Sequence, residues 1–145
     1  LNDGGHDAST RAELLAKSAL WRNVYVAESN AQAEDELSAL LLKTREHMMH
    51  VREAYNPPDF EIEPAMLNAW TDPRVGDEEA LKFTLDSGSL YGDAEHVAGE
   101  VEALRDAGVA HLLCQTGFGD MTHDQNVASM RRFGSQVMPR FADAH

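Results

Sequence analysis

A single cysteine, Cys114, and a shortage of basic residues set the first limits on what this sequence encodes. One thiol excludes a disulfide within the 145 residues and any cysteine-rich metal site. The 12 basic residues against 25 acidic ones give a net charge of −13, which argues against nucleic acid as a partner because phosphate binding needs clustered lysine and arginine. No apolar run approaches membrane-spanning length, and residues 1–10 lack the apolar core of a signal peptide. We therefore expect a cytoplasmic protein without a membrane partner.

The last third of the chain has the clearest signals for the starts and ends of its elements, and it predicts a helix, a strand, a loop and a helix. Asp93 is placed to cap the first helix, and Gly108 is placed to end it. The apolar run Val109–Gln115 predicts a strand that is covered on both faces, as parallel strands are. Residues 122–125 form a capping box for the last helix, which Pro139 should end. This order is the repeating unit of an α/β protein.

The earlier segments complete a helix-rich pattern in one domain, residues 1–145. A capping box at Ser29 opens a long helix that runs to about Tyr55. Residues 56–87 predict an irregular connection because prolines and polar residues interrupt every apolar period there. The remaining predicted elements are a helix over Arg11–Leu20, strands at Asn23–Ala27 and Ser87–Tyr91, and short helices at Pro64–Ala69 and Asp77–Phe83. Each strand precedes a returning helix, so we expect about three βα units with parallel strands.

Residue types at a set of positions, mainly in the C-terminal half, also resemble the sequence pattern of a known family. The positions that carry the resemblance are Gly92, Glu95, Val97, Gly108, Phe118, Gly119 and the run Val137–Phe141 (VMPRF). In this order and spacing they resemble the C-terminal end of bacterial-luciferase-like flavin monooxygenases. Ala94 departs from the pattern, since proline is common there. The run VYVAESNAQA, residues 24–33, looks like an earlier strand and helix start of the same family.

The resemblance implies a fold, a reaction and a set of partners. The fold would be the C-terminal portion of a (β/α)₈ TIM barrel, and because such a barrel needs about 250 residues, we expect this chain to be part of a longer protein. The function would be that of a flavin-dependent monooxygenase that uses reduced FMN and O₂ on a small organic substrate. A flavin reductase would supply the reduced FMN, and the enzyme would form a homo-oligomer such as a dimer. Two alternatives stay open: an F420-dependent oxidoreductase of the same superfamily, and a non-catalytic truncated barrel module that acts by association.

Candidate site residues follow from the position of barrel active sites at the carboxyl ends of the strands. Three places qualify: Glu28–Ser29, residues 91–93 and Gln115–Gly119. We predict that Tyr91, Gln115, Phe118 and Gly119 bind the cofactor, with Phe118 against its rings and Gly119 allowing a close backbone approach. The competing interpretation is that the loop glycines only form a turn and Phe118 seals the core. The resemblance implies that the family's catalytic histidine and most of its flavin-phosphate contacts lie upstream, so we assign no catalytic residue and expect no tight flavin binding by these 145 residues alone.

Histidine and cysteine positions do not predict a metal site. His47 and His50, with Glu46, are spaced to share a helix face and a metal ion, but a solvated helix face is the better interpretation of this cluster. We expect His111 to be a hydrogen-bonded core or interface residue. Cys114, on a strand predicted to be buried, should act as a small apolar side chain.

Overall fold

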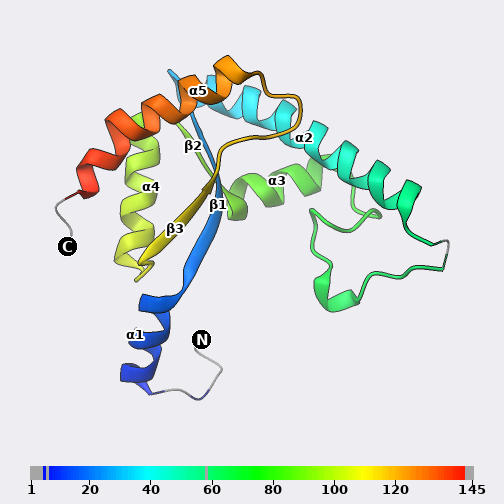
Figure 1. Ribbon diagram of the computed structural model, residues 1–145, viewed down its shortest axis with the longest axis horizontal. Coiled ribbons are helices and arrows are strands. Elements are labelled where there is room, and N and C mark those ends of the chain that lie inside the picture. Colours follow the sequence, from blue (N-terminus) through cyan, green and yellow to red (C-terminus); the bar gives the residue numbers. More distant parts are fainter. Residues whose placement is uncertain (1–4, 6, 58, 143–145) are drawn as a thin grey trace.

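Three short parallel strands form the centre of the molecule (Figure 1). The computed structural model describes residue 5, residues 7–57 and residues 59–142. The strands are β1 (Ala19–Val26), β2 (Ser89–Gly92) and β3 (His111–Gln115), and their order across the sheet is β2-β1-β3. β3 pairs with the first part of β1, from Ala19 to Asn23, and β2 pairs with the second part, from Asn23 to Val26. The predicted α/β class and the parallel pairing are thus confirmed.

Helices cover both faces of this sheet. Tyr25 of β1 and Ala27, which directly follows β1, pack with Leu37 in a core cluster formed with α2 (Asn30–Tyr55) and α3 (Asp77–Gly88). Val24 and Val26 on the other face pack with Val97 of α4 (Ala94–Asp106) and with the chain that follows α5 (His123–Arg132). Figure 1 shows α2 and α3 on one side of the strands and α4 and α5 on the other. Alternating residues of β1 therefore contribute to two separate cores.

This arrangement differs from that of three consecutive barrel units, in which the second strand would lie in the middle and every helix on one face. Here the connection from β1 to β2 and the connection from β2 to β3 run in opposite directions across the sheet. Right-handed crossovers in opposite directions place their helices on opposite faces. An apolar strand such as β1 has the same sequence signature in either arrangement, which is why the sequence did not distinguish them.

Most predicted element ends are confirmed by local hydrogen bonds. The Asp93 carboxylate accepts from the His96 N–H at 2.8 Å, Thr122 and Gln125 complete their capping box, and Gly108 has φ +92°. Asp7 caps α1 (Ala8–Lys17), so the helix predicted over Arg11–Leu20 begins and ends three residues earlier than predicted.

Two strand and helix boundaries also differ from prediction. β1 starts at Ala19, earlier than the predicted Asn23, and α3 continues to Gly88, so β2 is shorter than predicted. The chain does not leave its helical path at Pro139: a π-helical stretch, Phe133–Val137, leads into a 3₁₀ helix, Met138–Phe141. Proline is tolerated there because it lies in the first turn of the 3₁₀ helix, where its missing N–H has no partner to lose.

β3 is less buried than its apolar sequence predicts. Leu113 is 55% exposed, and His111 and Cys114 are also exposed. The predictions of a covered strand and a buried thiol are therefore wrong, and His111 is not a core residue, while an interface role for it stays a prediction. The physical reason is position, because β3 is an edge strand and extends beyond the part of the sheet that α2 and α3 cover.

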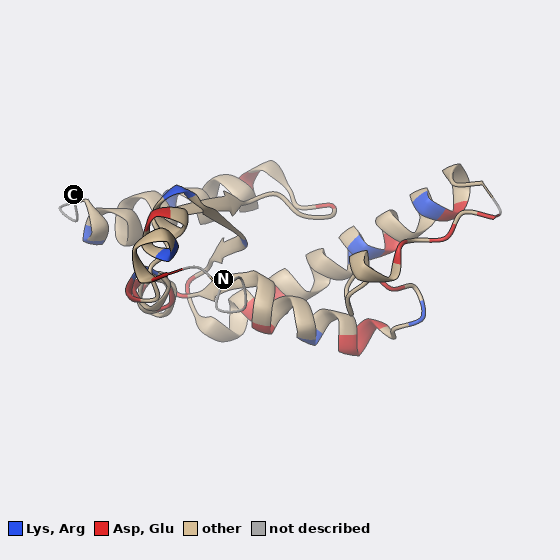
Figure 2. Cartoon of the chain, turned by 90° about the horizontal axis from the view of Figure 1, so that it is seen from below, with Lys and Arg blue, Asp and Glu red and all other residues tan. Residues whose placement is uncertain are grey.

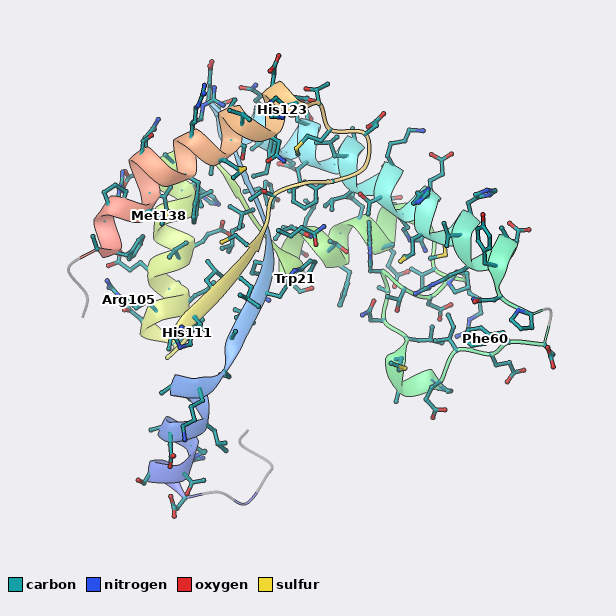
Figure 3. All side chains as sticks on the ribbon, viewed as in Figure 1. Trp21, Phe60, Arg105, His111, His123 and Met138 are labelled. Atoms are coloured by element: carbon teal, nitrogen blue, oxygen red, sulfur yellow. The ribbon has the colours of Figure 1, made fainter. Side chains whose placement is uncertain are left out.

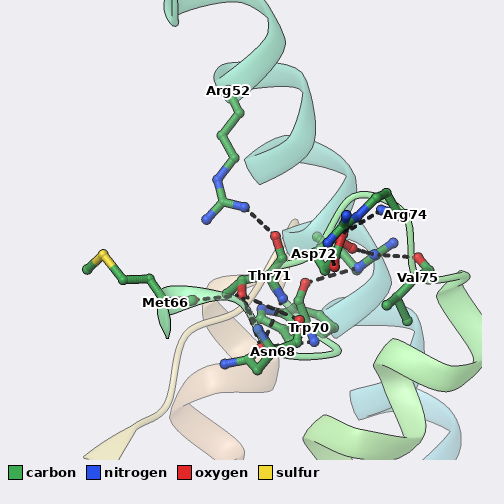
Figure 4. Close-up of polar contacts among 9 residues, drawn as sticks. Arg52, Met66, Asn68, Trp70, Thr71, Asp72, Arg74 and Val75 are labelled. Atoms are coloured by element: carbon green, nitrogen blue, oxygen red, sulfur yellow. Dashed lines mark hydrogen bonds and ion pairs between the residues drawn. The ribbon is translucent and has the colours of Figure 1, made fainter. Parts of the chain in front are cut away.

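The connection between α2 and α3 is ordered by two arginines of α2, Arg45 and Arg52, and Figure 4 labels Arg52 with residues of the connection. The buried Arg45 guanidinium donates to the carbonyl oxygens of Trp70, Asp72 and Val75 at 3.2, 3.0 and 2.7 Å, and it also pairs with Asp77. Arg52 donates to the Thr71 carbonyl oxygen at 2.6 Å. The prolines prevent a long helix here, as predicted, and leave the 3₁₀ helix η1 (Pro64–Met66), while charge-assisted hydrogen bonds fix the path.

We expect Arg45→Ala to lower the free energy of unfolding by about 2 kcal/mol, because three carbonyl groups lose a charged donor. Urea unfolding followed by circular dichroism measures this. Arg52→Ala is the matched control: it removes one such bond and should cost about half as much. Equal losses for the two variants would show that Arg45 is not the main anchor of this connection.

Candidate functional site

The loop after β3 folds onto α2. The Gly119 N–H donates to the Thr44 hydroxyl at 2.8 Å, and Gly119 has φ +47°. A Cβ at Gly119 would lie 2.6 Å from the Leu40 carbonyl oxygen, so the close backbone approach that this glycine permits is to α2. The Phe118 side chain is 4% exposed and packs in the core cluster of Tyr25 and Leu37. This geometry matches the competing interpretation, in which Phe118 seals the core.

The other two predicted cofactor residues lie in different surroundings. Tyr91 is partly buried against the same core cluster as Phe118, and burial raises the pKa of its hydroxyl, with smaller contributions from the charges of Glu34 and Asp86. The Gln115 amide instead turns back on its own loop and donates to the Gly117 carbonyl oxygen at 3.2 Å. The structure thus brings Tyr91 and Phe118 into one cluster and leaves Gln115 outside it. A binding role for the four residues stays a prediction.

A chain of polar contacts crosses the carboxyl end of β1. The Tyr25 hydroxyl donates to the Glu36 carboxylate, which also accepts from the Gln32 amide at 3.0 Å. Gln32 accepts from the Glu28 N–H at 3.4 Å, and Arg132 donates to the Glu28 carboxylate at 2.9 Å. Burial, followed by the Glu36 carboxylate, raises the pKa of Tyr25 strongly, so this hydroxyl stays protonated as a donor. The network joins β1, α2 and α5 at the end where α/β active sites lie.

Ser129 is a second polar anchor that sequence reasoning missed. Its buried hydroxyl accepts from the Val26 N–H at 2.8 Å. β3 pairs with β1 only as far as Asn23, so α5 satisfies a backbone group of β1 beyond the end of the ladder. No local pattern marks Ser129, since a serine inside a helix is ordinarily solvent-exposed. Glu28, by contrast, was identified because it follows a predicted strand.

A shallow depression lies along α4, beside the start of α2. It has a volume of about 510 Å³, and its lining includes Asn30, Asp93, His96 and Glu100. Glu100 directs one carboxylate oxygen into the protein without a hydrogen-bond partner, and its other oxygen is 4.0 Å from His96 Nε2. Burial raises the pKa of Glu100, while the His96 charge and a hydrogen bond from the Tyr91 backbone partly offset the effect of burial. A half-buried carboxyl group beside a histidine is a recurring feature of functional sites.

The raised pKa of Glu100 predicts a pH-dependent effect of Glu100→Gln on stability. At pH values below the ordinary glutamate pKa both states are protonated, and the residue contributes nothing. As pH rises from the ordinary pKa towards the raised one, the unfolded state loses its proton first and the folded state becomes less stable. Glu100→Gln removes this penalty, so its melting temperature relative to the wild type should rise as the pH increases above the ordinary glutamate pKa.

Glu95→Gln provides a control of opposite sign. The Arg140 guanidinium, 2.6 Å away, lowers the pKa of Glu95, so this carboxylate stabilises the folded state above its ordinary pKa. Its replacement should therefore lower the relative melting temperature by a constant amount above the ordinary glutamate pKa, and this difference should disappear as the pH falls through the lowered pKa. A Glu100→Gln difference that is independent of pH would show that Glu100 titrates like a solvated side chain.

The residues described here do not form a flavin cradle by themselves. The Phe118 ring is enclosed by protein, and α2 fills the space in front of Gly119. A flavin phosphate needs positive groups or free N–H donors, but Asp120 in this loop is acidic, and nearby Lys43 is paired with Glu46 at 2.7 Å. Lys and Arg lie scattered over several helices in Figure 2.

The described residues also do not gather metal ligands. No group of three histidine, cysteine or carboxylate side chains within them is arranged to hold a metal ion. His47 and His50 are exposed on α2, and the Glu46 carboxylate beside them is engaged by Lys43. Among the same residues, no helix is both long and apolar enough to cross a membrane.

The comparisons with known proteins support the fold only. No family model matches the chain, and no curated protein matches it significantly. Its fold is similar to that of the monooxygenase RslO1 from Streptomyces bottropensis, with a TM-score of 0.53 and 18% sequence identity. The similarity covers 86% of this chain and 31% of that one, so the chain spans less than a third of the solved protein. At this identity the similarity shows a shared fold and not a shared reaction.

Proposed function

We propose that this chain is the C-terminal part of a flavin-dependent monooxygenase that uses reduced FMN and O₂ on a small organic substrate. One observation carries the proposal: nearly the whole chain, 86%, superposes on part of a monooxygenase. The order of Gly92, Glu95, Gly108, Phe118 and the run Val137–Phe141 supports it independently, because it resembles the C-terminal end of luciferase-like enzymes. A flavin reductase would supply the reduced cofactor.

In this proposal, the rest of the longer protein supplies most of the cofactor site. The flavin provides the oxygen chemistry when it is bound, and the protein provides binding, orientation and exclusion of water. The chain described here contributes a rigid layer at the carboxyl ends of its strands. The Tyr25–Glu36 hydrogen bond, the Ser129–Val26 bond and the packed Phe118 hold that layer in place. The observed strand order, β2-β1-β3, is not that of consecutive barrel strands, so in this proposal the additional sequence joins the sheet at an outer edge.

The test is to express the complete reading frame that contains these residues and to titrate it with FMN and, separately, with F420. The 145-residue chain is the matched control. We expect the longer protein to bind one cofactor in the micromolar range or tighter and the control to bind neither. Oxygen consumption with a flavin reductase and a panel of aldehydes, alkanes and aromatic compounds then tests turnover. Binding of F420 alone would favour the F420-dependent oxidoreductase, and binding of neither cofactor would contradict the proposal.

The second candidate is a non-catalytic module that acts by association. The loop after β3 favours the non-catalytic module, because Phe118 and Gly119 of this loop pack against α2 of the same chain. A reading frame that begins near Leu1 and yields a stable product with no response to either cofactor would support the module. The same expression experiment therefore separates the two candidates.

A further inference from the structure

The two outer edges of the sheet differ in how they are protected. β3 forms one edge, and its sequence HLLCQ contains no proline, no glycine and no lysine, arginine or carboxylate. Alternate residues of a strand direct their N–H and C=O groups to opposite edges, so part of the β3 backbone faces outward. In the part of the chain that the structure describes, no further strand pairs with this edge. Exposed edges normally carry charges, prolines or bulges, and β3 has none of these.

The edge formed by β2 is obstructed. Ala27 N–H donates to the Gly92 carbonyl oxygen at 2.9 Å, so Gly92 faces β1 and the adjacent Tyr91 backbone faces outward. The Glu100 carboxylate lies against that outward backbone, with one oxygen buried. A strand that paired with β2 would have to displace this carboxylate. The contrast between the two edges identifies β3 as the edge that can accept a partner.

An apolar groove follows the open edge. It has a volume of about 980 Å³ and runs between β3 and the helical segment of residues 130–141. The groove includes Leu112 and Phe133 together with the half-exposed Met130 and Met138, which are 50% and 57% exposed. On the opposite face of the sheet, Trp21 is 49% exposed next to its register partner Leu113 (Figure 3 labels Trp21 and Met138). Apolar surface on both sides of an open edge fits an apolar partner.

We infer that the outer edge of β3 is the acceptor for an additional, predominantly apolar β-strand supplied by the polypeptide beyond these 145 residues. A strand is the appropriate partner because it alone presents N–H and C=O groups at the spacing of a ladder. Its source follows from the comparison with RslO1, in which this chain corresponds to only 31% of the solved chain. The inference rests on the proposal that this chain is part of a longer protein, and it assigns the surface at which the two parts join.

Hydrogen–deuterium exchange on the complete reading frame and on the 145-residue chain tests the inference. We expect amides within residues 111–115 to exchange at least about tenfold more slowly in the longer protein, whereas those of residues 89–92 should change little. Equal exchange at β3 in both proteins, or a reading frame that supplies no further strand, would overturn the inference. If the β3 amides of the 145-residue chain became more protected as the concentration of that chain increased, the edge would pair with a second copy of the chain. That result would overturn the choice of partner.

Leu113→Lys provides an independent measurement. Leu113 is 55% exposed, so the substitution should leave the melting temperature of the 145-residue chain nearly unchanged but lower that of the longer protein by several degrees. Tyr55→Lys, at an 81% exposed position of α2, should affect neither protein. Equal effects of Leu113→Lys in both proteins would refute the inference. Neither readout requires a flavin, so a longer protein that protects β3 but binds no cofactor would refute only the proposed function.

Discussion

Leu37→Ala should lower the free energy of unfolding by about 2–5 kcal/mol, among the largest losses that we expect from a single substitution. Leu37 has no solvent exposure and lies in the core cluster between α2 and β1, where Phe118 also packs. Removal of its side chain loses the favourable transfer of apolar atoms from water and leaves a cavity. Close-packed neighbours on two elements can fill that cavity only in part. Urea unfolding monitored by circular dichroism measures the loss.

Leu14→Ala is the matched control for this prediction. Leu14 is 39% exposed on α1, a helix that has no buried residue, so the same chemical change should cost less than about 1 kcal/mol. Because Phe118 shares the Leu37 cluster, Leu37→Ala should also accelerate proteolysis of the 115–121 loop. A loss below about 1 kcal/mol for Leu37→Ala would show that α2 does not pack on the sheet as described.

Local chemistry made the helix ends predictable. Asp93 accepts from an N–H three residues later, and Gly108 adopts a positive φ that other residues avoid, so each signal is contained in a few consecutive residues. The parallel direction of the strands followed equally from the alternation of strands and helices. Such signals require no knowledge of distant parts of the chain.

The sheet order and the polar anchors depend on long-range contacts that no local pattern records. Ser129 and Val26 are 103 positions apart, and Arg132 and Glu28 are 104 apart. The apolar character of β3 indicated burial, but whether a strand is covered depends on which elements lie beside it. The same limit applies to the candidate site. Tyr91, Phe118 and Gly119 were identified by their position after strands, yet that rule does not reveal that Phe118 turns inward against α2.

Gly119→Ala tests whether the loop after β3 packs against α2 or faces a cofactor. We expect this substitution to cost roughly 2–4 kcal/mol of folding stability. Two effects combine: alanine is strained at φ +47°, and its Cβ would lie 2.6 Å from the Leu40 carbonyl oxygen. Backbone atoms of α2 cannot move aside as a flexible side chain would. The loop should therefore shift and weaken the 2.8 Å hydrogen bond from the Gly119 N–H to Thr44. Denaturant unfolding measures the loss of stability, and amide exchange at residues 117–121 reports the displacement.

Gly117→Ala is the control within the same loop. Its added Cβ would lie 3.7 Å from the nearest atom, on Asn126, and Gly117 does not have a positive φ, so the cost should stay within about 0.5 kcal/mol. A Gly119→Ala variant as stable as Gly117→Ala would contradict the packing described here. If that stable variant also weakened cofactor binding by the longer protein, Gly119 would face the cofactor and not α2. A large loss of stability in the 145-residue chain, where no cofactor is bound, would instead assign this glycine to the contact between the loop and α2.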